Sequence, residues 1–369
     1  MSASPSSGTA NPSAHKPVGA NAPGSNFSGP KLDPTPFFDL VRGNLATELL
    51  CSGVNHLQIP KKLARGPKPA EALREEIGLA PRAWVVLSCA LKAMNIIVEQ
   101  GGLVELTPQG MEFLTEGEFD MQGYMGLVAQ TPGVLALLER LTGNKPAANR
   151  ADEGDAFIFR EGKASAMDDE AAARRLTLAL SGRARICGPA LGQVVAASGK
   201  KRILDVGGGS GLYAIAILKA DPLARATVWD RAAVLKVAAD FARRYGVEDR
   251  LDLVEGDMFR DPVPEGHDGF LLSNILHDWD FPECHQILRR LHKAGVKGAA
   301  LWIHDVFLNE ELDGPLSLAL YSTALFTLTE GRAYSAGEYR AMLRGNGFAD
   351  LPGIVETAVH CGVISAEAV

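Results

Sequence analysis

The fold is decided by residues 202–218, which read RILDVGGGSGLYAIAIL. Residues 202–206 form an apolar run of strand length, and the run ends in a turn rich in glycine at residues 207–211. The apolar residues that follow recur as they do in a helix. Glycines in such a turn let backbone N–H groups approach a ligand closely at the start of a helix. The stretch therefore predicts a strand, a ligand-binding turn and a helix.

Two familiar nucleotide-binding patterns do not fit this turn. A dinucleotide fingerprint, GxGxxG, needs glycine at its sixth position, where the chain has Leu212. A P-loop needs GxxxxGK followed by Ser or Thr, and no lysine follows this turn. Asp205 stands just before the glycines instead. Its carboxylate would repel a pyrophosphate and would suit a cationic ligand, such as an amino group or a sulfonium.

Strands and helices alternate from this turn onward. Further apolar runs of strand length are separated by helical segments and occupy 226–230, 251–254, 269–275 and 299–305. Such alternation predicts an α/β fold, a doubly wound parallel sheet with helices on both faces.

Acidic residues follow the first three predicted strands. Asp230 ends the second strand, where a carboxylate can accept both hydroxyls of a ribose. Asp257 follows the third strand and can accept a hydrogen bond from an adenine amino group, while Met258 or Phe259 packs against the ring. Open α/β sheets bind ligands at the carboxyl ends of their strands. Asp205, Asp230 and Asp257 together therefore predict a cofactor site.

The N-terminal region divides into three segments. Residues 1–36 contain 7 Ser, 7 Pro and 4 Gly, so we expect a disordered tail. Residues 37–115 carry short helical patterns and then a small hairpin, which is the plan of a winged helix. Residues 116–197 are predicted to be a helical linker and substrate lid, with the last helix interrupted near Gly188 and Pro189. The sheet domain then spans 198–369.

Charge and cysteine content exclude several classes of function. The chain has 37 Lys and Arg against 44 Asp and Glu, and the winged-helix segment has 8 of each sign, so nucleic-acid binding is disfavoured. The 5 cysteines are far apart without a CxxC pair, which predicts no metal site and a reduced, cytoplasmic protein. The longest apolar stretch, 84–98, is too short to span a bilayer, and no signal peptide is visible at the N-terminus.

Three motifs carry a resemblance to a known family. They are DVGGGSG at 205–211, GDMF at 256–259 and LHDW at 276–279. The chain from about residue 37 resembles the S-adenosylmethionine-dependent O-methyltransferases typified by plant caffeic acid and bacterial polyketide enzymes. That resemblance implies a Rossmann-like class I methyltransferase sheet and a homodimer formed through the winged-helix domain. The cofactor S-adenosylmethionine is then expected to contact Asp205, Gly207, Gly209, Asp230, Asp257, Met258 and Ser273.

The same resemblance implies an acid–base site. His277 follows the fourth strand at the ligand edge of the sheet, and an imidazole can take the proton of a phenol near neutral pH. Asp305, at the end of the fifth strand, is expected to orient it. The family's second acidic residue falls at Ala333, within GRAYS at 331–335, and Glu330 is considered as its substitute.

The resulting hypothesis is methyl transfer to a hydroxyl of an aromatic or polyketide-like small molecule, with His277 as general base. The acceptor pocket is expected to have apolar and aromatic walls, and Arg183 could meet an acidic substituent. Candidate walls are Tyr124, Met125, Leu180, Trp279, Phe307, Tyr321, Leu325 and Phe326. Because Ala333 departs from the family pattern, two alternatives to base catalysis by His277 remain: methylation governed mainly by proximity, and C-methylation or hydroxylation on the same scaffold. A winged-helix regulator that senses S-adenosylmethionine is a further alternative.

Overall fold

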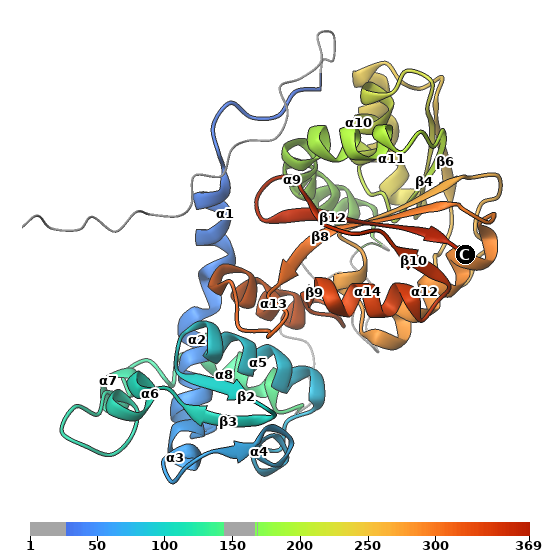
Figure 1. The fold of residues 1–369 in the computed structure, drawn as a ribbon. Helices are drawn as coiled ribbons and strands as arrows, with labels where there is room; N and C mark the ends of the chain where they lie inside the picture. The colour runs from blue at the N-terminus through green and yellow to red at the C-terminus, as the bar shows by residue number, and fades with distance from the viewer. Residues whose placement is uncertain (1–26, 144–166, 168) are drawn as a thin grey trace, which may run out of the picture.

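The structure, a computed structural model, describes residues 27–143, 167 and 169–369. Figure 1 shows an N-terminal half of short helices beside a larger half built on a sheet. No helix in the described ranges is both long enough and apolar enough to cross a membrane.

The chain is ordered earlier than the predicted tail allows. Residues 1–26 of that tail lie outside the described residues. Phe27, however, is buried, and its ring lies 5.1 Å from the ring of Tyr245. The first helix then begins at Thr35. An aromatic side chain can bury enough apolar area to offset the cost of ordering its neighbours. The composition of residues 1–36, averaged over the segment, hides this effect of a single residue.

The N-terminal half contains helices around a small antiparallel sheet with the strand order β1-β3-β2. Strands β2 and β3 form a hairpin whose turn residues, Gly101 and Gly102, both have positive φ, as a type I′ turn requires. The α-helices are α1 (Thr35–Arg42), α2 (Ala46–Cys51), α3 (Ile59–Leu63), α4 (Ala70–Ile77), α5 (Pro81–Ala93), α6 (Pro108–Phe113), α7 (Gln122–Gly126) and α8 (Pro132–Leu141), and the strands are β1 (Lys68–Pro69), β2 (Ile97–Gln100) and β3 (Leu103–Leu106). Short non-α turns at Gly43–Leu45 and Ser52–His56 join α1, α2 and α3.

The large sheet has the order β10-β12-β8-β7-β4-β5-β6. Its strands are β4 (Arg202–Val206), β5 (Arg225–Asp230), β6 (Leu251–Glu255), β7 (Gly269–Ser273), β8 (Ala300–Leu308), β10 (Phe348–Asp350) and β12 (Cys361–Ala368), with β9 (Tyr334–Ser335) and β11 (Val355–Glu356) paired at its margin. The strands from β4 to β8 are parallel, so the predicted α/β fold is confirmed. The antiparallel strands β12 and β10 were not predicted. Strand β4 pairs with β5 on one side and β7 on the other, which creates a switch point where such sheets bind ligands.

Helices cover both faces of this sheet (Figure 1). One face packs against helix α9 (Glu170–Ala197), together with α10 (Leu212–Ala220) and α11 (Ala232–Tyr245). The other carries α12 (Phe281–Ala294) and α14 (Ala336–Arg344), whose apolar residues form a second core cluster.

Helix α9 corrects the predicted interruption, because it runs through Pro189 without ending. A proline inside a helix removes one hydrogen bond and usually breaks or kinks the helix. Here close packing against α10 favours continuation: a Cβ atom on Gly192 would lie 2.6 Å from the carbonyl oxygen of Ala216. The glycine therefore lets the two helices approach closely around the proline.

The two halves interlock through buried polar and aromatic contacts. The Arg42 side chain is 4% exposed, its Nη1 donates to the Val359 carbonyl at 2.8 Å, and its guanidinium lies 4.9 Å from the ring centre of Tyr321. Tyr321 belongs to α13 (Leu316–Leu328), which packs against α1 and α5 (Figure 1). These contacts hold the N-terminal half beside the edge of the sheet that carries the predicted site.

Candidate active site

A cavity of about 640 Å³ opens at the carboxyl ends of β4, β5 and β7. Its walls come from α9, the glycine turn and the loops that follow the strands. They include six of the seven residues predicted for the cofactor: Gly207, Gly209, Asp230, Asp257, Met258 and Ser273. Leu180, Arg183 and Trp279 also line it, whereas the other predicted walls do not. Tyr124, for example, is 73% exposed on α7.

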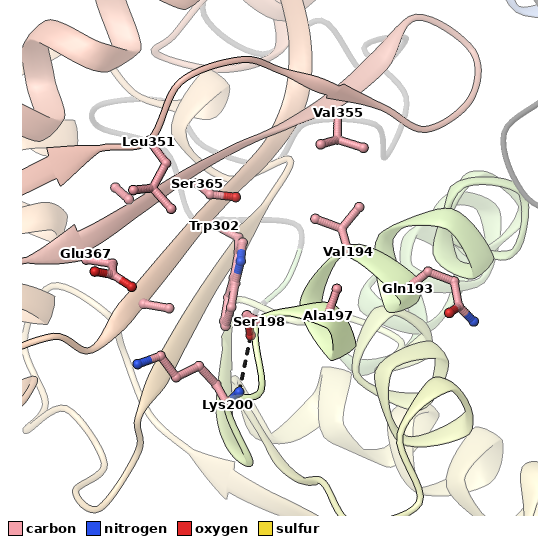
Figure 2. A pocket seen from close by; sticks show the side chains of 12 residues that line it. Gln193, Val194, Ala197, Ser198, Lys200, Trp302, Leu351, Val355, Ser365 and Glu367 are labelled. Carbon is pink, nitrogen blue, oxygen red and sulfur yellow. Dashed lines mark hydrogen bonds between the residues drawn. The ribbon is translucent and has the colours of Figure 1, made fainter.

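A second hollow, of about 490 Å³, lies elsewhere on the molecule. Figure 2 shows it between the C-terminal turns of α9 and the strands β8 and β12, with Val194, Trp302 and Leu351 on its walls. None of the predicted site residues lines it. The larger cavity is therefore the candidate active site.

The glycine turn is shaped to bring backbone close to a ligand. Gly207, Gly209 and Gly211 all have positive φ, a conformation that side chains disfavour. A Cβ atom on Gly207 would lie 2.6 Å from Ile275 Cδ1 and 3.1 Å from Met258 Cε. The backbone here therefore forms part of the cavity floor, which no larger residue could do.

Asp230 faces this floor from the end of β5. Its Oδ2 accepts from the Gly209 N–H at 2.8 Å, and its Oδ1 accepts from the Arg231 N–H at 2.7 Å. Burial raises the pKa of Asp230, although these two backbone bonds favour the charged form. Asp257 lines the cavity beyond β6, where its Oδ1 accepts from the Phe259 N–H at 2.8 Å. The carboxylates predicted to hold ribose and adenine thus lie at one cavity.

Asp205 is the exception among the predicted cofactor residues. It is fully buried in β4 and does not line the cavity. A Cβ atom on Gly208 would lie 2.6 Å from its Cγ, so the carboxyl group sits behind the glycine turn. Burial, with a further contribution from the charge of Asp230, raises the pKa of Asp205 to about 8. Asp205 is therefore mostly uncharged at neutral pH and lies behind the turn instead of at the cavity wall.

Ser273 is already engaged by a buried histidine. Its Oγ lies 2.8 Å from His304 Nδ1, and Nε2 of the same ring lies 3.0 Å from Thr357 Oγ1. Burial lowers the pKa of His304 to about 3, so this imidazole is neutral. His304 therefore orients the Ser273 hydroxyl at the cavity wall.

His277 and Asp305 are in direct contact. His277 Nδ1 lies 2.6 Å from Asp305 Oδ1, and both side chains are almost fully buried. Asp305 Oδ2 accepts from the Tyr339 hydroxyl at 2.9 Å, and Oδ1 accepts from the Val306 N–H at 2.8 Å. Burial opposes a charge on His277, but the combined effect of Asp305, Tyr321 and Asp278 outweighs it and raises the pKa of His277 to about 10.

The acid nearest to His277 on its Nε2 side differs from the one that the sequence suggested. Glu330 does not substitute for the acidic residue expected at Ala333: its Oε2 lies 3.3 Å from Arg82 and 3.9 Å from Arg140, which draw it toward the N-terminal half. Asp278 is the nearer acid, with Oδ1 3.7 Å from His277 Nε2. Burial raises the pKa of Asp278 to about 6, and Asp278 lines the cavity. Asp278 was not among the predicted site residues, although it is adjacent to His277 in the chain.

Three further side chains come together behind the cavity. The ligating atoms of Cys187, His304 and Cys361 all lie within 4.8 Å of one another, and all three residues are buried. The prediction of no metal site considered only neighbours in sequence, so it could not detect this group from α9, β8 and β12. The hydrogen bond between the two thiols raises the pKa of Cys187 and lowers the pKa of Cys361, and the charges of Arg183 and Arg42 are smaller effects that lower both. The same two guanidinium groups would repel a bound cation.

Comparisons with known proteins agree with this geometry. A family model described as an O-methyltransferase domain matches residues 155–349. The 3-hydroxy-5-methyl-1-naphthoate 3-O-methyltransferase of Streptomyces sahachiroi is 30% identical over 331 residues, which cover 89% of this chain and 93% of that protein. An O-methyltransferase family 2 protein from Planctomyces limnophilus, solved in complex with apigenin, is 41% identical with a TM-score of 0.82, covering 93% of this chain and 98% of that one. Human N-acetylserotonin methyltransferase, solved with S-adenosylmethionine, is 22% identical with a TM-score of 0.54 over 92% of this chain and 99% of its own, and shows the fold alone.

Proposed function

The chain belongs to the family of S-adenosylmethionine-dependent O-methyltransferases, and from this premise we propose that it methylates a hydroxyl of an aromatic or polyketide-like small molecule with His277 as general base. The observation that carries the proposal is the buried pair of His277 and Asp305, 2.6 Å apart. Neither residue lines the cavity, but Asp278 and Trp279, which follow His277 in the chain, do. The names of the relatives support the acceptor class, because one acts on a hydroxynaphthoate and another was solved with the flavone apigenin. They favour O-methylation over the alternatives of hydroxylation, C-methylation and regulation.

The residues of the cavity fit the cofactor. Asp230 would accept from the ribose hydroxyls and Asp257 from the adenine amino group, and Met258 would pack on the face of the ring; all three line the cavity. The indole nitrogen of Trp229 is buried at the cavity wall without a hydrogen-bond partner among the described residues. When bound, S-adenosylmethionine supplies an electrophilic methyl group on a sulfonium sulfur.

His277 handles the proton of the acceptor. A phenol is a poor nucleophile until its hydroxyl proton leaves, and Nε2 is the nitrogen of His277 that Asp305 leaves free to accept it. Asp305 holds the proton on Nδ1 and stabilises the imidazolium that forms, while the Tyr339 hydroxyl fixes the second carboxylate oxygen. The Asp278 carboxylate, on the Nε2 side, stabilises the same charge.

Turnover tests this proposal directly. Purified protein is incubated with methyl-labelled S-adenosylmethionine and a panel containing simple phenols, hydroxynaphthoates and flavones. We expect a product heavier by one methyl group, and NMR places that group on oxygen. Tight binding of S-adenosylhomocysteine without turnover of any panel member would count against the proposal, and a methyl group on carbon would redirect it.

Asp230→Ala is expected to weaken binding of S-adenosylhomocysteine by about 1–3 kcal/mol, since it removes a hydrogen-bonding partner from a buried site. Asp240→Ala is the matched control, because Asp240 is a half-exposed acid on α11 that pairs with Arg174. Isothermal titration measures both dissociation constants. Equal affinity of Asp230→Ala and the unmodified protein would remove Asp230 from the cofactor site.

The pH profile follows from the raised pKa of His277. At pH 7 the free enzyme holds this imidazole protonated, so one proton must leave before it can act as a base. We expect kcat/KM to rise about tenfold per pH unit from pH 7 toward a plateau near pH 10. Asp278→Asn removes a carboxylate that raises this pKa, so its profile should shift to lower pH. A flat profile between pH 7 and 9 would show that His277 is not the titrating base.

We further propose that the protein forms a homodimer through its N-terminal half and acts in the cytoplasm. Large apolar side chains are exposed on α1, where Phe37, Leu40 and Val41 are between 72 and 75% exposed. Such a patch on a soluble domain usually marks a contact surface. Light scattering of the purified protein should give twice the monomer mass, and Leu40→Glu with Val41→Glu should give a monomer. A monomeric unmodified protein would refute the dimer.

The cytoplasmic location is supported by five cysteines that are all buried as free thiols.

A further inference from the structure

Two of the five buried cysteines lie side by side where α9 packs against β12. Cys187 comes from α9 and Cys361 opens β12, and their sulfur atoms lie within 4.8 Å of each other. A hydrogen bond joins the two thiols. An S–S bond is about 2.05 Å long, so the sulfur atoms need to approach each other by less than about 3 Å to form one.

The turn before β12 holds both thiols in place. Cys187 Sγ lies 3.7 Å from the Ala358 carbonyl oxygen of this turn, and Cys361 follows the same turn in the chain. Arg42, at the end of α1, donates to the Val359 carbonyl at 2.8 Å. The backbone next to Cys361 is therefore fixed from two sides, by α9 and by α1.

The surroundings of the pair favour a thiolate on Cys361. The hydrogen bond between the thiols lowers the pKa of Cys361 and raises the pKa of Cys187. The charges of Arg183 and Arg42 lower the pKa of Cys361 further, whereas burial and the charge of Asp305 oppose them. The thiolate is the nucleophilic form of cysteine. Cys361 is therefore the sulfur suited to attack an oxidant, with Cys187 placed to react next.

Hydrogen bonds connect this pair to the cofactor cavity. The Thr357 hydroxyl donates to the Cys361 carbonyl at 3.1 Å, and its oxygen lies 3.0 Å from His304 Nε2. His304 Nδ1 lies in turn 2.8 Å from the Ser273 hydroxyl, which lines the cavity. A displacement of Cys361 therefore reaches the cavity wall through two hydrogen-bonded side chains.

We propose that Cys187 and Cys361 form a redox-active pair, which hydrogen peroxide closes to a disulfide with a loss of cofactor affinity. Peroxide is close in size to water, and Ala184, one helical turn before Cys187, lines the cavity. The buried pair is therefore within short reach of a small oxidant, whereas bulky thiol reagents are excluded. Disulfides that occur in a reducing compartment are usually of this transient, redox-sensing kind.

The reaction takes two steps. The Cys361 thiolate attacks one peroxide oxygen, the O–O bond breaks, and the departing hydroxide takes up a proton to give water and a sulfenic acid on Cys361. Cys187 then attacks the same sulfur, the S–O bond breaks and the S–S bond forms. The Cys187 proton leaves with the hydroxide as a second water. The two sulfur atoms together lose two electrons, and the peroxide gains them.

Counting thiols after oxidation tests the pair in the unmodified protein. The protein is treated with hydrogen peroxide and then catalase, denatured, and labelled with N-ethylmaleimide. We expect three labels instead of five, and a digest that contains one peptide joining Cys187 to Cys361. Five labels after peroxide, or sulfinic acid on single cysteines without the joined peptide, would overturn the pair.

A third cysteine supplies the matched control. Cys284 is also fully buried, but its thiol donates to the Leu276 carbonyl at 3.3 Å. Cys284→Ser should therefore still form the joined peptide, with two labels left after peroxide. Cys187→Ser should form no joined peptide and keep the labels of its other buried thiols. A joined peptide that includes Cys284 in the unmodified protein would show unspecific oxidation and overturn the assignment.

Calorimetry with S-adenosylhomocysteine tests the link to the cavity. We expect the oxidised protein to bind it about 2- to 10-fold more weakly, the worth of one hydrogen bond, and dithiothreitol to restore the affinity. Peroxide also converts methionine to its sulfoxide, and Met258 lines the cavity, but dithiothreitol does not reverse that product. Cys187→Ser treated in the same way should show no loss that dithiothreitol recovers.

The outcomes are independent of the proposed function, because neither readout requires methyl transfer. A disulfide-linked protein with unchanged affinity for S-adenosylhomocysteine would overturn the effect on the cavity. A protein that methylates no acceptor would refute the proposed function and leave both redox results as they are.

Discussion

Replacing His277 with alanine is expected to lower kcat by about 10²- to 10⁴-fold, the range that a positioned general base contributes. The substitution removes the nitrogen that would take the acceptor proton and leaves the methyl-donor site intact. Affinity for S-adenosylhomocysteine should therefore stay within about twofold, because no cofactor-facing residue is changed. Measured kcat, with calorimetry for the cofactor, checks both halves of this expectation.

The same substitution also changes the surroundings of Asp305. Without the imidazole, Asp305 keeps its bonds to Tyr339 and the Val306 N–H but loses the positive partner that lowers its pKa. Its buried carboxyl group should then bind a proton more readily, and added imidazole should restore part of the activity. His360→Ala is the control, since that histidine is partly exposed, pairs with Asp39 and does not line the cavity. Full activity of His277→Ala would end the general-base assignment.

Replacing Gly331 with alanine is the second large effect. A Cβ atom there would overlap the carbonyl oxygen of His277 and lie 2.5 Å from the Trp279 backbone nitrogen. Both atoms belong to the backbone, so the turn that carries His277 must move. Displacing a catalytic group by about 1 Å can cost about 100-fold in rate, and we expect a loss of kcat of that order.

A matched glycine separates this clash from the general effect of adding a methyl group. Gly182 lies inside α9, and a Cβ atom on it would meet nothing within 4 Å. Gly182→Ala should keep its activity and gain about 0.5–1 kcal/mol of stability, because alanine is the better helix former. Thermal unfolding and kcat measured on both variants test the contrast. An active Gly331→Ala protein would show that the turn adapts at little cost.

The central strands could be predicted because burial on both faces leaves a plain pattern. The runs at 202–206 and 251–254 agree with β4 and β6 to within one residue. Strand β12 escaped prediction, because its insertion between β8 and β10 depends on contacts from distant parts of the chain. The continuity of α9 through Pro189 escaped for the same reason, as Gly192 allows the packing against α10 that overrides the local signal.

The sequence predicts which residues lie at the carboxyl ends of the strands. It predicts less well whether a side chain at such a position points into the cavity. Asp230 and Asp257 reach the cavity because each follows a strand that ends there. Asp205 also ends a strand, yet it is covered by the glycine turn. Glu330 turns away because Arg82 and Arg140, which are distant in sequence, attract it. Such long-range pairing is invisible in a single sequence.

All five cysteines are buried, so their reactivity toward a thiol reagent reports how often the structure opens. A thiol reagent can modify a buried cysteine only when the surrounding structure opens, so the labelling rate reports the free energy of that opening. Cys51 and Cys89 lie in the N-terminal half, whereas Cys187, Cys284 and Cys361 lie in α9 and the sheet half. Equal protection of both groups would mean that the halves melt as one cooperative unit, and unequal protection would reveal which half opens first.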